Sequence, residues 1–256
     1  MWPVALITMS PCRFALLFAA VLAIAGRPAS AQVIITLQNA TASFSQSGFP
    51  VSTAIDGSTV PGNGWAHLGL HQDDAAVFET VSDASFASYD FTLLNVDLQD
   101  PTHEIGRFRI SATTDDRSTF ADGAQSGGAV AANWTVLDLT NLVSSAGSTL
   151  TVLSDGSVLV SGPTPNTDIY TFSASTALTG ITGFRLEVLT DPSLPNGGPG
   201  RASNGNFVLS EFTVTGVPEP SMYALFAVGL VGFGVVALRR RCALTRVAAR
   251  SGRVRV

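Results

Sequence analysis

The stretches IGRFRISATT at residues 105–114 and ITGFRLEVL at residues 181–189 decide the fold class of this chain. In the first, Phe108 and Ile110 alternate with arginines, and in the second Leu186 stands between two charged residues. Because successive side chains of a strand point to opposite faces, this alternation predicts β-strands with one buried face.

Similar short runs recur through residues 32–216, among them AVFETV, YDFTLLNVDL, NWTVLDL, DIYTFSAS and NFVLSEFTVTG. They are rich in β-branched and aromatic residues, and turn sequences such as SDGS, GPTPN and PNGGPG separate them. Many short strands divided by such turns predict an all-β domain, either an antiparallel β-sandwich or a barrel.

Two segments narrow this prediction: FPVSTAIDGSTVPGNGWAH at residues 49–67 and NGNFVLSEFTVTG at residues 204–216. An early Asp-Gly loop followed by a tryptophan, with an acidic residue in the last strand, resembles the galactose-binding-like (discoidin-like) jelly roll. The resemblance implies an antiparallel sandwich over residues 32–216. It also implies that the early loop and the last strand meet and hold a structural calcium ion.

The candidate calcium ligands are Asp56 and Glu211. Gly57 permits a sharp turn that directs backbone carbonyls toward an ion, and calcium takes about six to eight oxygen ligands. Glu211 interrupts an apolar strand, and its two-residue spacing from Leu209 and Thr213 predicts an inward carboxylate, which is costly unless a cation pairs with it. A water-exposed glutamate on an edge strand is the alternative.

Two tryptophans are candidates for stacking on a sugar. Trp65 is predicted on a loop beside His67, and these two are the candidate ligand-binding residues, whereas Trp134 is predicted to face the core. His67 and His71 have the four-residue spacing of a helical metal pair. The surrounding sequence predicts a loop or strand, where such residues do not converge.

Other acidic residues suggest weaker candidates. Asp115, Asp116 and Asp122 in TTDDRSTFADG form an alternative cation site, although their spacing is not that of a known calcium loop. His103 and Glu104 stand together before a predicted strand, and a polar strand edge is the simpler interpretation.

The charge of the chain excludes some classes of function. All 14 basic residues are arginines, and residues 32–216 hold five of them against 18 acids, a formal charge of −13. Such a domain repels phosphate backbones, so we expect no nucleic-acid partner. Cys12 and Cys242 lie outside it, which leaves no internal disulfide or thiol nucleophile. The sequence contains no serine-elbow, P-loop or dinucleotide-binding signature. Because carboxylates are abundant, a glycosidase activity is not excluded.

The N-terminal residues 1–31 are predicted to be a secretory signal peptide. An apolar run follows Arg13, and Ala29-Ser30-Ala31 places small residues at the cleavage positions before Gln32. The run is too short to span a bilayer comfortably.

The sequence VPEPSMYALFAVGLVGFGVVALRRR at residues 217–241 combines three features. Residues 222–238 are uncharged and long enough, at about 1.5 Å per residue, for a transmembrane helix across a thin bilayer. Three arginines follow and predict a cytoplasmic end by the positive-inside rule, continued by the basic tail 242–256. The two prolines before the span hold an extended backbone, which suits a protease.

This order resembles the PEP-CTERM sorting signal. The resemblance rests on Pro218, Glu219 and Pro220, on the apolar span, and on Arg239, Arg240 and Arg241. It implies an exosortase-type transpeptidase as partner and a precursor anchored in the inner membrane. The tail after Arg241 is longer than the family pattern.

Together these features predict an exported, non-enzymatic protein of the cell envelope or extracellular matrix that binds or associates with exopolysaccharide. Two alternatives remain open. One is a structural surface or biofilm protein without a discrete ligand, and the other is an enzyme acting on polysaccharide.

Overall fold

The computed structural model describes residues 32–60, 62–69, 71–96 and 102–218. The predicted signal peptide (1–31) and everything from Glu219 onward lie outside these residues. The predicted transmembrane span, the three arginines after it and the basic tail therefore lie outside them too. Among the described residues, no helix is long and apolar enough to cross a bilayer.

The described chain folds almost entirely as β-structure. Its strands are β1 (Val33–Ile35), β2 (Leu37–Ala42), β3 (Trp65–Ala66), β4 (Asp74–Ala84), β5 (Ser88–Val96), β6 (Arg107–Thr113), β7 (Thr135–Val136), β8 (Leu139–Ser144), β9 (Thr149–Val152), β10 (Val158–Ser161), β11 (Thr167–Ser175), β12 (Ile181–Val188), β13 (Val208–Leu209) and β14 (Glu211–Val217). Three short 3-10 helices complete it: η1 (Val51–Ile55), η2 (Arg117–Thr119) and η3 (Pro195–Gly197).

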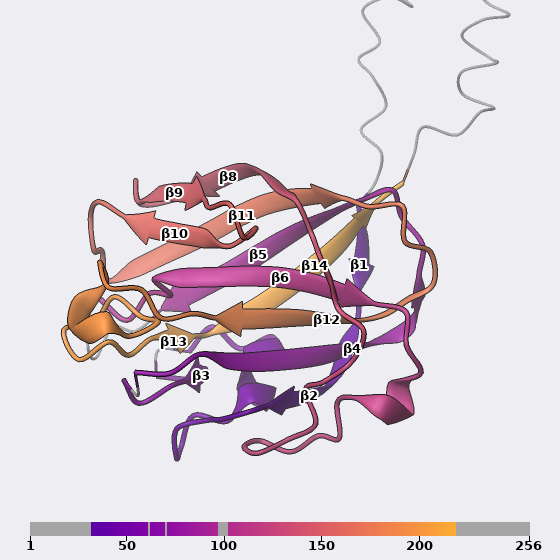
Figure 1. Cartoon of the computed structure of the whole chain (residues 1–256), viewed down its shortest axis with the longest axis horizontal. Coiled ribbons are helices and arrows are strands. Elements are labelled where there is room, and N and C mark those ends of the chain that lie inside the picture. The colour runs from indigo at the N-terminus through magenta and orange to yellow at the C-terminus, as the bar shows by residue number, and fades with distance from the viewer. Residues whose placement is uncertain (1–31, 61, 70, 97–101, 219–256) are drawn as a thin grey trace, which may run out of the picture. The chain divides into compact units, whose positions relative to one another are not determined.

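These strands form two main sheets and one small one. The first sheet has the order β1-β14-β5-β11-β8, and the second has the order β2-β4-β12-β6-β10-β9 with β7 beside β6. Strands β13 and β3 form the small sheet. Every strand pairing is antiparallel. Figure 1 shows β6 and β12 of the second sheet lying across β5 and β14 of the first.

The predicted alternation explains why the sheets pack against each other. Along β5, and along β12 from Phe184 onward, every second side chain is buried, so each sheet has one apolar face. Rings from the two faces meet: the centroids of Phe78 and Phe212 are 5.0 Å apart, and those of Phe108 and Phe172 are 5.3 Å apart. The all-β antiparallel prediction is thus confirmed, and the packing is that of a sandwich.

The two ends of the described chain lie side by side. Strand β1 pairs with β14 at the edge of the first sheet, with Val33 opposite Gly216 and Ile35 opposite Val214. Strand β14 ends at Val217, one residue beyond the predicted domain boundary at 216. The fold therefore brings the predicted mature N-terminus next to the start of the sorting segment.

Candidate functional sites

The early loop and the last strand meet, as the sequence predicts. Helix η1 ends at Ile55, and the next two residues turn back over β14, where the Gly57 N–H donates to Glu211 Oε2 at 3.1 Å. Gly57 adopts a φ of 75°, a conformation that favours glycine. Asp56 is held within the loop, because Oδ1 accepts from the Ser58 N–H at 2.7 Å and Oδ2 accepts from the Asn63 side-chain amide at 3.1 Å.

The Asp56 carboxylate of the loop acts on the Glu211 carboxylate of β14. The pKa of Glu211 is raised to about 7, chiefly by burial; the Gly57 N–H lowers it in part and the negative charge of Asp56 adds to the rise. No group of three or more His, Cys, Asp or Glu side chains that could hold a metal occurs among the described residues. Any cation here would therefore need backbone or amide oxygens beside the two carboxylates.

The predicted inward orientation of Glu211 is wrong. Along β14 the buried face carries Phe212 and Val214, while Thr213 is exposed and Glu211 is only partly buried. The spacing from Leu209 misled the prediction because Ser210 separates β13 from β14, so the two residues lie on different strands. Glu211 is shielded by the early loop instead of by the core.

The prediction that Trp65 is an exposed stacking residue is also wrong. Its side chain is fully buried on β3, where the indole Nε1 donates to the Phe44 carbonyl at 2.9 Å. The ring packs edge-on against Phe207, with centroids 5.0 Å apart. The loop reading failed because β3 pairs with β13, a partner far away in the sequence, with Trp65 opposite Leu209.

His67 shares this burial and is not available to an external ligand. It is fully buried, and its Nε2 lies 2.5 Å from Asp74 Oδ2. Burial alone would raise the pKa of Asp74, but contacts with His67, Ser43 and Gln72 outweigh it and hold that pKa below its ordinary value. His71 contacts Asn196 instead, so the two histidines have separate partners, as expected outside a helix.

In the loop that holds the alternative cation site, each carboxylate accepts hydrogen bonds from nearby residues of the chain. Asp115 accepts from Asn133, Asp116 caps the N-terminus of η2 through the Ser118 N–H, and Asp122 accepts from the Ala124 and Ala129 N–H groups. These contacts shape the loop and supply each carboxylate with donors.

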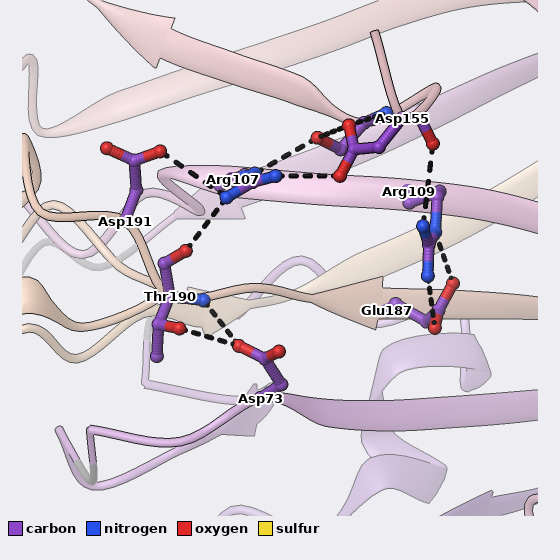
Figure 2. A network of polar contacts seen from close by, with 8 residues as sticks. Asp73, Arg107, Arg109, Asp155, Glu187, Thr190 and Asp191 are labelled. Carbon is purple, nitrogen blue, oxygen red and sulfur yellow. Dashed lines mark hydrogen bonds and ion pairs between the residues drawn. The ribbon is translucent and has the colours of Figure 1, made fainter. Parts of the chain in front are cut away.

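Two arginines on the outer side of β6 belong to an internal network (Figure 2). Arg107 Nη2 lies 2.7 Å from Asp155 Oδ2, and its Nη1 lies 3.4 Å from Asp191 Oδ2. Arg109 makes a two-pronged contact with Glu187, at 2.7 Å and 2.9 Å. The network ties the β9–β10 turn and the segment after β12 onto β6, which is a structural role.

Trp134 does not face the core, contrary to the prediction. It belongs to a small separate cluster with Phe120 and Val77 on the other side of the second sheet. The guanidinium of Arg185 lies 5.2 Å from its ring centroid, a cation–π arrangement. The indole N–H is already used, since it donates to the Val130 carbonyl at 2.9 Å.

Sequence reasoning missed a buried charged cluster formed by Glu104, Asp168 and Arg201. The prediction that Glu104 lies at a polar strand edge is wrong, because its side chain is only 1% exposed. Both of its carboxylate oxygens are buried, and neither has a hydrogen-bond partner on another residue. Burial raises its pKa, its own backbone and Arg201 lower it in part, and Asp168 raises it.

The other two members of this cluster are well provided with contacts. Asp168 accepts from the hydroxyls of Ser144 and Ser148 at 2.6 Å and 2.7 Å. Arg201 donates to the Gly162 carbonyl at 2.7 Å and to Ser148 Oγ at 3.1 Å. The Arg201 guanidinium acts on Glu104 through its charge, and of the two carboxylates only that of Asp168 accepts hydrogen bonds from other residues.

Comparison with known protein families decides the nature of the C-terminal segment. Residues 216–241 match the model of the PEP-CTERM protein-sorting motif. The chain therefore carries a PEP-CTERM sorting motif. It begins inside β14, at Gly216, so no linker separates it from the sandwich. Such a motif implies export, a membrane-anchored precursor and processing by an exosortase. No curated protein matches the chain.

Among solved structures, the chain is similar to small modules at low identity. One is a family 32 carbohydrate-binding module of Clostridium perfringens NanJ in complex with galactose, at 10% identity and a TM-score of 0.40, covering 72% of this chain and 98% of that one. Another is an F5/8 type C domain from Bacteroides fragilis, at 9% identity and a TM-score of 0.44, covering 73% and 98%. These are domains of the kind named by the sequence resemblance. At such scores they assign no ligand.

Proposed function

We propose that this chain is an exported precursor whose β-sandwich is released or sorted by an exosortase-type transpeptidase and then associates with extracellular polysaccharide without catalysing a reaction. The observation that carries the proposal is the PEP-CTERM motif over residues 216–241. Its direct continuity with β14 supports the sandwich as the cargo, because processing at the Pro-Glu-Pro sequence would leave β14 intact up to Val217.

Polysaccharide is the proposed partner because of the charge and the destination of the domain. A formal charge of −13 over residues 32–216 disfavours phosphate polymers and leaves neutral polymers and cations as compatible partners. A structural surface protein without a discrete ligand remains the second candidate.

The first prediction concerns processing and binding. Intact-mass analysis of the protein from native envelope and matrix is expected to show a species that begins at Gln32 and lacks Cys242. Replacing Pro218 and Pro220 with alanine should block this processing while leaving membrane insertion intact, because the apolar span determines insertion. The exposed Pro192→Ala serves as the matched control and should be processed normally.

The processed protein should also co-sediment with purified exopolysaccharide and release no reducing sugar from it. A mature species that extends to Val256 would contradict the sorting proposal. Sugar release by the purified protein would favour the enzyme alternative, and the absence of binding would favour the structural one.

We also propose that the early loop holds a calcium ion through Asp56 and Glu211. The donor set fits a hard cation: two carboxylates approach the same Gly57 turn, and the partial burial of Glu211 beside Asp56 disfavours its charged form. Carbonyl oxygens of the loop would complete the ligand shell. A bound divalent cation would stabilise both ionised carboxylates and fasten η1 to the last strand.

The calcium proposal predicts a metal-dependent melting temperature. At a calcium concentration of about 100 times the dissociation constant, the free energy of unfolding should rise by about 2.7 kcal/mol. The effect should be largest at alkaline pH, since protons compete for carboxylate ligands. Glu211→Gln should abolish most of it, whereas Asp83→Asn, a change at an exposed acid, should not. Thermal melts in chelator, calcium and magnesium provide the measurement, and identical curves for metal-free and calcium-loaded protein would refute the proposal.

A further inference from the structure

The sorting motif begins inside a strand that has partners on both sides. Strand β14 lies between β1 and β5 in the first sheet. Gly216, the first residue of the motif, is opposite Tyr89 of β5 and Val33 of β1. Val217 still pairs with β5, and Pro218, which has no N–H to donate, is the first residue beyond the strand. The first two residues of the motif are therefore part of the folded sandwich.

An aromatic ring from the β4–β5 turn covers the backbone of Gly216. A Cβ added at Gly216 would lie only 2.4 Å from the ring of Phe86, so the strand is in direct contact with that ring. Phe86 is itself held in place, because its N–H donates to the Tyr89 hydroxyl at 3.1 Å and its ring packs edge-on against that of Tyr89. Two strands and one ring thus surround the point where the motif begins.

Of the two partners of β14, β1 is the more weakly held. Its register with β14 covers three residue pairs, whereas that of β5 covers seven. Val33 and Ile34 are largely exposed and only Ile35 is buried, so little apolar surface holds β1 on the sheet. The side chain of Gln32 adds one hydrogen bond, to Asp90 Oδ2. Short segments at a chain end open with low free energy, and β1 has these properties.

We propose that the pairing of β1 with β14 restrains processing of the precursor, and that β1 must separate from Gly216 before a transpeptidase engages the residues ahead of Pro218. The inference rests on the proposed function, because it concerns the regulation of that same processing step. An extended peptide is commonly recognised by adding it as a strand to another sheet, which requires free backbone N–H and C=O groups. Within β14 these groups already serve the sandwich.

The absence of a linker makes this restraint effective. No residue separates Val217, the end of β14, from the Pro-Glu-Pro sequence. An enzyme that contacts two residues ahead of Pro218 must therefore bind Gly216 and Val217, which are inside the sheet. The apparent affinity for such a segment is reduced by the fraction of molecules in which it is free. Processing should accordingly become faster when the motif is moved away from the sheet.

A pulse-chase measurement of the full precursor, in cells that contain the transpeptidase, tests the proposal. Inserting Gly-Ser-Gly-Ser between Val217 and Pro218 places the motif up to about 13 Å farther from the strand and changes no residue of the sandwich. We expect processing to become several-fold faster. The matched control inserts the same four residues after Gly147, in the exposed turn between β8 and β9, and should leave the rate unchanged.

A second variant acts on β1 itself. Ile35→Asp removes the one buried apolar side chain of β1 and should favour its separation, so the native precursor is expected to be processed faster. In the background of the insertion after Val217, the same substitution should give no further increase, because the motif is already clear of the sheet. Thermal melts of the purified variants establish that the rest of the sandwich remains folded.

Each outcome bears on the proposal. An insertion after Val217 that leaves the rate unchanged, or that acts no more than the insertion after Gly147, overturns the restraint while leaving the sorting function intact. Equal acceleration by Ile35→Asp with and without the insertion would show that this variant acts through general unfolding, and it also overturns the restraint. If neither the native precursor nor any variant is processed, the sorting proposal itself fails, and this inference fails with it.

Discussion

Replacing Arg201 with alanine is expected to lower the free energy of unfolding by about 3–5 kcal/mol, the range observed when one partner of a buried charge pair is removed. Arg201 is 6% exposed, and its positive charge lowers the pKa of the buried Glu104 carboxylate in part. Its loss also leaves the Gly162 carbonyl without its donor. Urea unfolding at pH 7 measures the change.

Two controls separate charge from packing in this result. Arg201→Lys keeps the positive charge but loses the planar fork, so it should cost less than alanine. Arg117→Ala removes an arginine whose partner Asp83 is 62% exposed, and such surface pairs contribute about 0–1 kcal/mol. An Arg201→Ala variant as stable as Arg117→Ala would show that the cluster does not depend on its cation.

Neutralising Glu104 is expected to have the opposite effect, so Glu104→Gln should stabilise the protein at pH 8. The folded-state pKa of Glu104 is raised above its ordinary value of 4.5, chiefly by burial. A group with a raised folded-state pKa contributes stability that is fully present below its unfolded pKa. That contribution is lost as the pH rises through the folded-state value. Thermal melts between pH 4 and pH 9 should therefore fall less steeply for the variant than for the native chain.

The double variant tests whether the two residues interact. If Arg201 acts mainly by compensating Glu104, the loss from Arg201→Ala should be smaller in the Glu104→Gln background, giving a coupling energy of about 0.5–3 kcal/mol. Additive effects would show instead that Arg201 acts through Gly162 and Ser148. A Glu104→Gln protein that is less stable than the native chain at every pH would contradict the buried, partnerless carboxylate.

The sheet-forming part of the fold could be predicted from the sequence because its information is local. Alternation around Phe108 and Leu186 reports directly which side chains are buried, since the period of a strand is two residues. The meeting of the early loop with Glu211 was also predicted, although through a resemblance. The order of strands in the two sheets had no comparable local signal.

At the candidate sites, the sequence does not predict which side chains are buried by residues far away in the chain. The sequence predicts a loop at Trp65, but β3 pairs with the distant strand β13. It predicts a polar strand edge at Glu104, but that side chain is buried in the cluster with Asp168 and Arg201. Glu211 was placed on the wrong face because a single residue, Ser210, divides its strand from β13. For Trp65 and Glu104 the deciding contacts span many residues, which composition and spacing do not encode, whereas the Glu211 error comes from a local break between two strands.

Trp65 and His67 are excluded as residues that contact a polysaccharide directly. Both side chains are fully buried, and the indole N–H of Trp134 is already bound to the Val130 carbonyl. The arginines of Figure 2 are likewise engaged with carboxylates of the chain itself. Under the proposed function, a polysaccharide would contact side chains of exposed loops instead, and the proposed calcium loop of Asp56 and Glu211 is one such loop.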